Sequence, residues 1–534
     1  MKKSFFGFMA VILTLMMLLS LGGCAGNDDQ PTAGSKTTES PTKAPEKTDD
    51  AKVSEKVEAD PLAENRPTLK FLVGNRNYDP NTDYSNIRME ELTGYDVEYF
   101  MLPNANADEK LLLEMSGGSE YDLVELWPAI FGKLASVGAL SSLDEYIEKY
   151  GNFIKAAVSD MAWEASKNAE GKIVGLPRQS GENISSPYGA RASRFLVTKK
   201  EILEELGLTV PTDLDNFYEF LVKIKEAKGV PPLTGAATKM DDIMSAFGIP
   251  SLGWIEKEGT YTPDIKLPEI RKYFRFMAKL YQEGLLDPDL PINKTENIDQ
   301  KFTSEGAWIC QYAFWDIPRL IPALEANGFS RDLVPFEEPL KDENGQYPLI
   351  NSFGVSKFYG VPRSSQHPEH AINYMNLLSE PETFKKSHIG DEGFHYEVKD
   401  GKYYPILPAF SDLNWANQFC GMSERKAEFE QWQARARKTP EMAVAYEQIN
   451  SKLVAHNLIF DRFSLTSSLP AVQQYAQSLN KMLGDFYIQA IVENKTTDAD
   501  FDEITARWES EGGSAIEAEV NQWLKDHPFE MPGK

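Results

Sequence analysis

Short hydrophobic runs alternate with amphipathic segments over residues 68–127. We expect buried strands at TLKFLVGN (68–75), YDVEYFML (95–102) and YDLVELW (121–127), where apolar residues follow one another closely. We expect helices that end at glycine at IRMEELTG (87–94) and ADEKLLLEMSGG (107–118). This order predicts βαβ crossovers and a mostly parallel sheet, so ligands are expected beyond the carboxyl ends of the strands.

Helical spacing dominates the later part of the chain. The segment PTDLDNFYEFLVKIKEA (211–227) predicts a helix that opens with a capping box of Thr212 and Asp215. A second helix is expected from Pro268 to Gly284, and HPEHAINYMNLLS predicts another that begins near Pro368. We expect the last hundred residues to be nearly all helical.

The N-terminus has the order of a secretory signal. Lys2 and Lys3 precede an apolar run that ends in Leu-Gly-Gly-Cys at 21–24, which resembles a bacterial lipobox. The resemblance predicts a signal peptide at 1–23 and a lipid-carrying Cys24; an uncleaved membrane anchor is the alternative. Residues 24–66 lack aromatic side chains up to Arg66 and predict a disordered tether.

Composition narrows the possible partners. The formal net charge of −26 argues against nucleic acid, because phosphate binding needs clustered lysine and arginine. Besides Cys24 only Cys310 and Cys420 are present, and these form either one disulfide or two buried thiols. The run DADFDE at 498–503 carries EF-hand-like spacing but has Glu503 where glycine is needed, so an acidic first helical turn is expected instead of a metal site.

Four segments in this order resemble the family 1 extracellular solute-binding lipoproteins of bacterial saccharide ABC importers. They are GKIVGLPR (171–178), FLVTKKEILEELGLTVPTDLDNFYEFLVKIKEA (195–227), YFRFMAKLYQEGLLDPDL (273–290) and GDEGFHYEVKDGKYY (390–404). Many members carry a calcium loop after the second block, but KGVPPLTGAATKM lacks its acidic residues. A calcium site is therefore not carried over from the resemblance, and the sequence indicates no metal and no cofactor.

The resemblance implies an α/β, two-lobed periplasmic-binding-protein-like fold of type II with a helical C-terminal part. The chain is expected to cross between lobes near Gln179, near Phe353 and after Tyr396, with the ligand cleft between the lobes. Lobe one is predicted at 67–179 plus 352–400, and lobe two at 180–351 plus 401–534.

A saccharide site needs aromatic planes for sugar faces and polar groups for hydroxyl edges. The candidate ligand-binding residues are Trp127, Arg178, Trp254, Trp315, Asp316, Glu392 and Tyr396. Each has a structural alternative: the aromatic side chains could pack in a core, Arg178 could pair with a carboxylate, and Glu392 could cap a loop.

The expected function is a non-enzymatic, lipid-anchored solute-binding subunit on the extracytoplasmic face of the membrane. It would be a monomer that binds an oligosaccharide and delivers it to ABC permease subunits. The alternatives are a peptide-binding or sensory ligand-presenting lipoprotein and, as the third choice, a secreted glycoside hydrolase. Against hydrolysis, the sequence has no HExxH, GxSxG or P-loop motif, and adjacent Asp391 and Glu392 give no evidence of a catalytic pair.

Overall fold

The computed structural model describes residues 60–76, 78–118, 120–180, 194–237, 240–257, 259–352, 354–412, 433–452 and 457–528. The chain divides into two units, Met1–Ala59 and Asp60–Lys534, and every described residue belongs to the second. The predicted signal peptide, Cys24, Phe353 and Cys420 lie outside the described residues.

A five-stranded sheet organises the first part of the second unit, with the strand order β2-β1-β3-β11-β4. The strands are β1 (Leu69–Val73), β2 (Val97–Met101), β3 (Leu123–Leu126), β4 (Leu176–Ser180) and β11 (Gly354–Gly360). Strand β1 is parallel to both β2 and β3, as the βαβ pattern predicts, whereas β11 is antiparallel to β3 and β4. The chain therefore returns to this sheet after more than 170 residues spent elsewhere.

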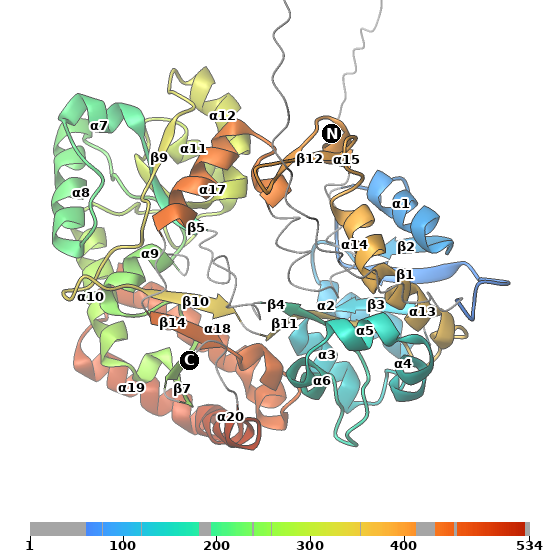
Figure 1. Ribbon diagram of the computed structural model, residues 1–534. Helices are drawn as coiled ribbons and strands as arrows, with labels where there is room; N and C mark the ends of the chain where they lie inside the picture. Colours follow the sequence, from blue (N-terminus) through green and yellow to red (C-terminus); the bar gives the residue numbers. More distant parts are fainter. Residues whose placement is uncertain are drawn as a thin grey trace, which may run out of the picture. The chain divides into compact units, whose positions relative to one another are not determined.

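Helices connect and cover these strands. They are α1 (Tyr84–Thr93), α2 (Ala107–Ser116), α3 (Pro128–Ser136), α4 (Asp144–Tyr150), α5 (Asn152–Ala157), α6 (Asp160–Ala165), α13 (Pro368–Ser379) and α14 (Pro381–His388). Helices α3 and α6 both contact β11 (Figure 1). In the core, the Phe131 ring of α3 stacks on the Phe358 ring of β11 at 3.8 Å.

A second, antiparallel sheet has the order β8-β5-β9, with β5 at Arg194–Lys199, β8 at Ile309–Ala313 and β9 at Leu333–Pro335. The helices of this part are α7 (Lys200–Leu206), α8 (Leu214–Lys228), α9 (Asp241–Met244), α10 (Pro268–Gln282), α11 (Thr295–Phe302) and α12 (Ile317–Ala326). Cys310 of β8 is a buried free thiol, and burial raises its pKa to about 12. For Cys310, this confirms the buried-thiol alternative.

Helices also make up most of the described C-terminal residues. They are α15 (Ala409–Asp412), α17 (Pro440–Lys452), α18 (Pro470–Val492), α19 (Asp498–Trp508) and α20 (Ser514–Asp526). Three strand pairs complete the described elements: β6 (Trp254–Lys257) with β7 (Thr260–Pro263), β12 (Tyr396–Lys399) with β13 (Lys402–Pro405), and β10 (Pro348–Ser352) with β14 (Asn457–Asp461). Strand β14 is an exception to the predicted all-helical end, because it pairs in parallel with β10.

The predicted capping box of α8 is wrong. The N-cap is Asp213, whose carboxylate accepts the Asn216 backbone N–H at 2.9 Å, so the helix begins one residue later than a Thr212 cap would place it. The predicted helices at 268–284 and 367–379 are confirmed as α10 and α13. Residues 67–179 and 352–400 supply the five strands of the first sheet, apart from the end of β4 at Ser180; the lobe boundaries themselves stay predictions.

Candidate functional site

Polar side chains gather where the parallel strands β1 and β3 end. Gly74 and Arg76 follow β1, while Glu125 lies in β3 and Trp127 directly after it. Because β1 and β3 are parallel neighbours, their carboxyl ends meet at the same edge of the sheet. This edge is where open α/β sheets bind ligands.

Glu125 is the centre of a buried ionic network. Its side chain is only 4% exposed and accepts the Gly74 backbone N–H at 2.8 Å and an Arg76 guanidinium N–H at 2.7 Å. The Lys357 ammonium donates to its other oxygen. Burial acts to raise the pKa of Glu125, but the charges of Lys357 and Arg76 hold it below its ordinary value. The carboxylate is therefore ionised, and it fixes two cations at the end of the sheet.

Lys357 and Arg178 lie side by side on neighbouring strands. They are directly paired in the register of β11 and β4, which places their side chains on one face of the sheet. Burial lowers the pKa of Lys357, and the nearby charge of Arg178 lowers it further, while Glu125 opposes both. The guanidinium of Arg178 is half-buried and forms no ion pair or hydrogen bond with any described residue.

Trp127 forms an aromatic wall beside this network. It is the N-cap residue of α3 and is half-buried, and its indole N–H donates to the Asp108 carboxylate at 3.1 Å. A Cβ atom added at Gly74 would lie 3.9 Å from the Trp127 ring and 3.2 Å from the Arg76 guanidinium. A side chain at position 74 would therefore crowd the Arg76 guanidinium, whereas its distance from the Trp127 ring is an ordinary van der Waals contact.

A buried arginine from a distant part of the chain also feels the charge of Arg178. Burial together with the charge of Arg178 lowers the pKa of Arg435. Burial and the charge of Arg435 lower the pKa of Lys438 to about 7.

The structure places Trp254 in an aromatic cluster rather than beside Trp127. Its ring stacks on Phe463 at 5.1 Å and lies 5.8 Å from Trp508 and 6.5 Å from Tyr261. This environment favours the packing alternative for Trp254.

Trp315 and Asp316 form a short turn after β8. Trp315 is 42% exposed and rests edge-on against Phe314, and the Asp316 carboxylate accepts the Ala313 backbone N–H at 3.0 Å. Arg319 joins Asp316 to Asp299. A polar pocket of about 440 Å³ next to this turn is lined by Asp299, Gln300, Thr303, Ser304, Arg319, Leu320, Ala323 and Asn327.

Glu392 and Tyr396 lie in one turn but in different surroundings. Glu392 is exposed, whereas Tyr396 is buried in a small cluster with Ile389, Phe410 and Ala434. The Tyr396 ring lies 5.3 Å from that of Tyr403. The surroundings of Tyr396 therefore favour packing.

Of the seven predicted residues, Trp127 and Arg178 come to the edge of the five-stranded sheet. Arg76, Glu125 and Lys357 belong to the same site but were not among the candidates. The sequence alone could have indicated Glu125, because it lies at the end of a predicted strand. It could not have indicated Lys357, because the place of Lys357 depends on β11 entering the sheet between β3 and β4.

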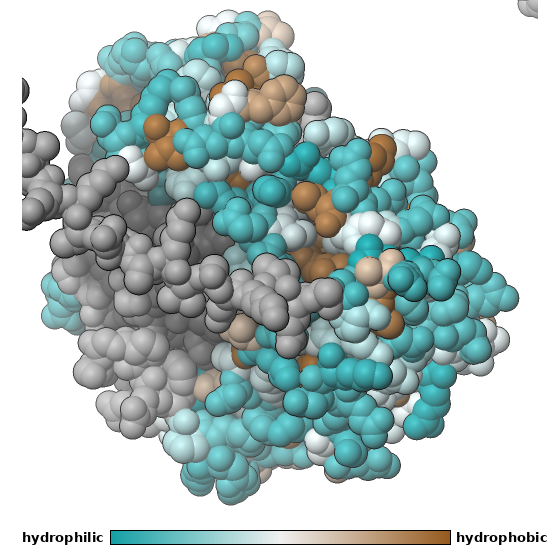
Figure 2. All heavy atoms as spheres, turned by 45° about the vertical axis from the view of Figure 1, so that its right-hand side comes forward, coloured by the Kyte–Doolittle hydropathy of each residue, from teal (hydrophilic) through white to brown (hydrophobic). Residues whose placement is uncertain are grey.

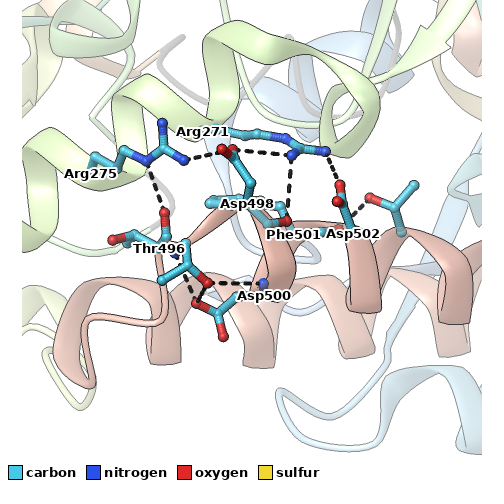
Figure 3. Close-up of polar contacts among 9 residues, drawn as sticks. Arg271, Arg275, Thr496, Asp498, Asp500, Phe501 and Asp502 are labelled. Carbon is cyan, nitrogen blue, oxygen red and sulfur yellow. Dashed lines mark hydrogen bonds and ion pairs between the residues drawn. The ribbon is translucent and has the colours of Figure 1, made fainter.

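The acidic run at 498–503 forms the first turn of α19 (Figure 3). Thr497 and Asp500 make a capping box, and Arg271 and Arg275 of α10 pair with Asp498 at 3.3 and 2.7 Å. The predicted helical turn is confirmed. The described residues contain no group of three or more histidine, cysteine or acidic side chains suited to hold a metal ion.

The face drawn in Figure 2 is mainly hydrophilic, with hydrophobic residues in small separate groups. The large apolar side chains that are exposed among the described residues include Leu113 and Phe394. Among the described helices, none combines the length and the apolar composition that crossing a membrane requires.

The chain is similar to proteins of known family along most of its length. Residues 83–383, more than half of the chain, match the family model described as "Bacterial extracellular solute-binding protein". A polygalacturonan/rhamnogalacturonan-binding protein of Bacillus subtilis (YtcQ) is 21% identical over 96% of this chain and 98% of its own. The lipoprotein LipO of Bacillus subtilis is 22% identical over 81% of this chain and 87% of its own.

Comparison with solved structures identifies the fold. The alginate-binding protein AlgQ2 superposes with a TM-score of 0.66 at 17% identity, covering 87% of this chain and 99% of that one. This confirms the α/β, two-lobed fold of type II. The matched family, the similarity along nearly the whole chain and the shared fold together place this protein among the bacterial extracellular solute-binding proteins.

Proposed function

We propose that the protein binds an oligosaccharide at the carboxyl edge of the five-stranded sheet and delivers it to the permease of an ABC importer. The observation that carries the proposal is the half-buried Trp127 indole beside the ionic network of Arg76, Glu125 and Lys357. An aromatic plane next to fixed donors and acceptors suits the two kinds of surface that a sugar presents. The polysaccharide-binding relative supports the same class of ligand.

Binding would favour a closed arrangement in which both lobes contact one ligand molecule. A ligand shifts such an equilibrium only by its difference in affinity for the open and closed forms. We therefore expect the free protein to sample open forms and the permease to recognise the closed one. Trp254, Trp315, Asp316, Glu392 and Tyr396 remain candidate contacts from the rest of the chain.

The proposal includes lipid attachment at Cys24 and a monomeric, non-catalytic protein. A lipid anchor would hold the protein at the outer face of the membrane, as the similarity to a lipoprotein supports. Fractionation of cells that express wild type or Cys24→Ala tests this point: wild type should remain with the membrane, and the variant should not carry labelled fatty acid.

Calorimetric titration of the full chain in mild detergent, against pools of oligosaccharides and of peptides, tests the ligand class. Saccharide binding with recovery of the unchanged sugar would support the proposal. Binding of peptides alone would favour a peptide or sensory role. Shortened sugars in the same incubation would identify a hydrolase.

A further inference from the structure

Basic side chains concentrate at the proposed site of a strongly acidic protein. The formal net charge of the chain is −26. At the edge of the five-stranded sheet, by contrast, the cations Arg76, Arg178 and Lys357 lie together with the carboxylates of Glu125 and Asp108.

The two carboxylates already have partners within the site. Glu125 accepts from Arg76, Lys357 and the Gly74 backbone, and Asp108 accepts the Trp127 indole N–H. Arg178 lies next to Lys357 in the strand register, yet its guanidinium bonds to no described residue. Arg178 therefore presents guanidinium donors that no described side chain uses, on the same side of the sheet as Lys357.

Arg178 and Lys357 are like charges on neighbouring strands, and the charge of Arg178 lowers the pKa of Lys357. Holding like charges together costs free energy, which a bound anion would recover. In a protein of high negative charge, a local positive site is also what an anionic ligand needs in order to approach.

We propose that the ligand is an acidic oligosaccharide and that Arg178 binds one of its carboxylates, with Trp127 against a sugar face. The inference rests on the proposed function and narrows its ligand class. A guanidinium offers two parallel N–H groups that match a carboxylate, whereas a neutral hydroxyl uses only one of them. Such a pair fixes both the position and the orientation of a uronate ring.

The test uses one pool of sugars in two chemical forms. Uronate oligosaccharides from partial hydrolysis of pectin and alginate are compared with the same pool after reduction of the carboxyl groups to alcohols. The reduction leaves linkages and ring stereochemistry unchanged. We expect the full chain in detergent to bind the acidic pool at least about tenfold more tightly, and this preference to weaken in high salt.

Arg178→Gln should reduce affinity for the acidic pool by about tenfold or more and change affinity for the reduced pool little. Arg178→Lys keeps the charge but not the paired donors, so it should give an intermediate loss. Arg363→Gln, at an exposed arginine outside the site, is the matched control. Thermal melting of each variant shows that the fold is intact.

Each outcome has a separate meaning. The inference is supported if Arg178→Gln no longer prefers the acidic pool over the reduced pool, while wild type and Arg363→Gln still do. Equal affinity for both pools, or preference that survives in Arg178→Gln, would overturn it while leaving oligosaccharide binding intact. If neither these pools nor a panel of neutral oligosaccharides binds, the proposed function fails as well.

Discussion

Replacing Glu125 by glutamine tests the ionic network at the end of the sheet. The change keeps the shape of the side chain but removes the charge that Arg76 and Lys357 share. An amide also turns an N–H group toward one of these donors. Removing one partner of a buried ion pair typically costs about 3–5 kcal/mol, because the remaining charge stays buried without compensation.

We expect the lower part of that range, about 3 kcal/mol, because the Lys357 and Arg76 side chains keep 17% and 11% exposure and can turn partly toward water. The assay is urea unfolding followed by tryptophan fluorescence. Glu120→Gln is the matched control, because its ion pair with Lys70 is exposed and its loss should leave the midpoint unchanged. The double variant Glu125→Gln/Lys357→Met should recover part of the loss.

The acid sensitivity of the protein gives a second readout of the same network. The pKa of Glu125 is held below its ordinary value in the folded protein. The contribution of Glu125 to the free energy of unfolding is therefore present above its pKa in the unfolded chain, about 4.3, and is lost as the pH falls. Wild type and Glu125→Gln should therefore approach each other in stability below about pH 4. An equal unfolding midpoint for both proteins at pH 7 would refute the reasoning.

Other predictions follow from single contacts. Trp254→Ala should destabilise by about 2–4 kcal/mol, since its ring stacks on Phe463, whereas Trp127→Ala should weaken oligosaccharide binding and destabilise less; urea unfolding and calorimetry separate the two effects. Burial raises the pKa of Asp242 to about 7. The free energy of unfolding of wild type should therefore fall relative to that of Asp242→Asn by about 1.4 kcal/mol per pH unit as the pH rises from about 4 to 7. A difference between the two proteins that stays constant over this pH range would contradict the raised pKa. Thr497→Ala removes the N-cap side chain of α19 and should lower the free energy of unfolding in urea by about 1 kcal/mol. An unchanged free energy of unfolding would mean that water replaces the cap.

Local signals were enough to predict the three parallel strands of the first sheet. The strands that became β1, β2 and β3 are short apolar runs separated by helices, and this order dictates parallel pairing. The edge proposed to bind the ligand follows from the same order, and Trp127 lies there because it directly follows β3.

The partners of the site could not be predicted in the same way. Glu125 and Lys357 are 232 residues apart, and nothing in the local sequence of β11 shows that it enters the sheet antiparallel to β3. Trp254 had a suitable position between an apolar segment and a turn, but its neighbour Phe463 comes from more than 200 residues later. Long-range contacts decide which aromatic side chains remain available to a ligand.

The late return of β11 has a consequence for synthesis of the protein. A ribosome releases β1, β2 and β3 long before residues 354–360 exist, and during that interval β3 has an open edge. The Glu125 carboxylate lacks its lysine over the same interval. The nascent N-terminal part is thus exposed to wrong strand pairing until most of the chain has been made, and a truncation before residue 354 should yield aggregate rather than a smaller folded protein.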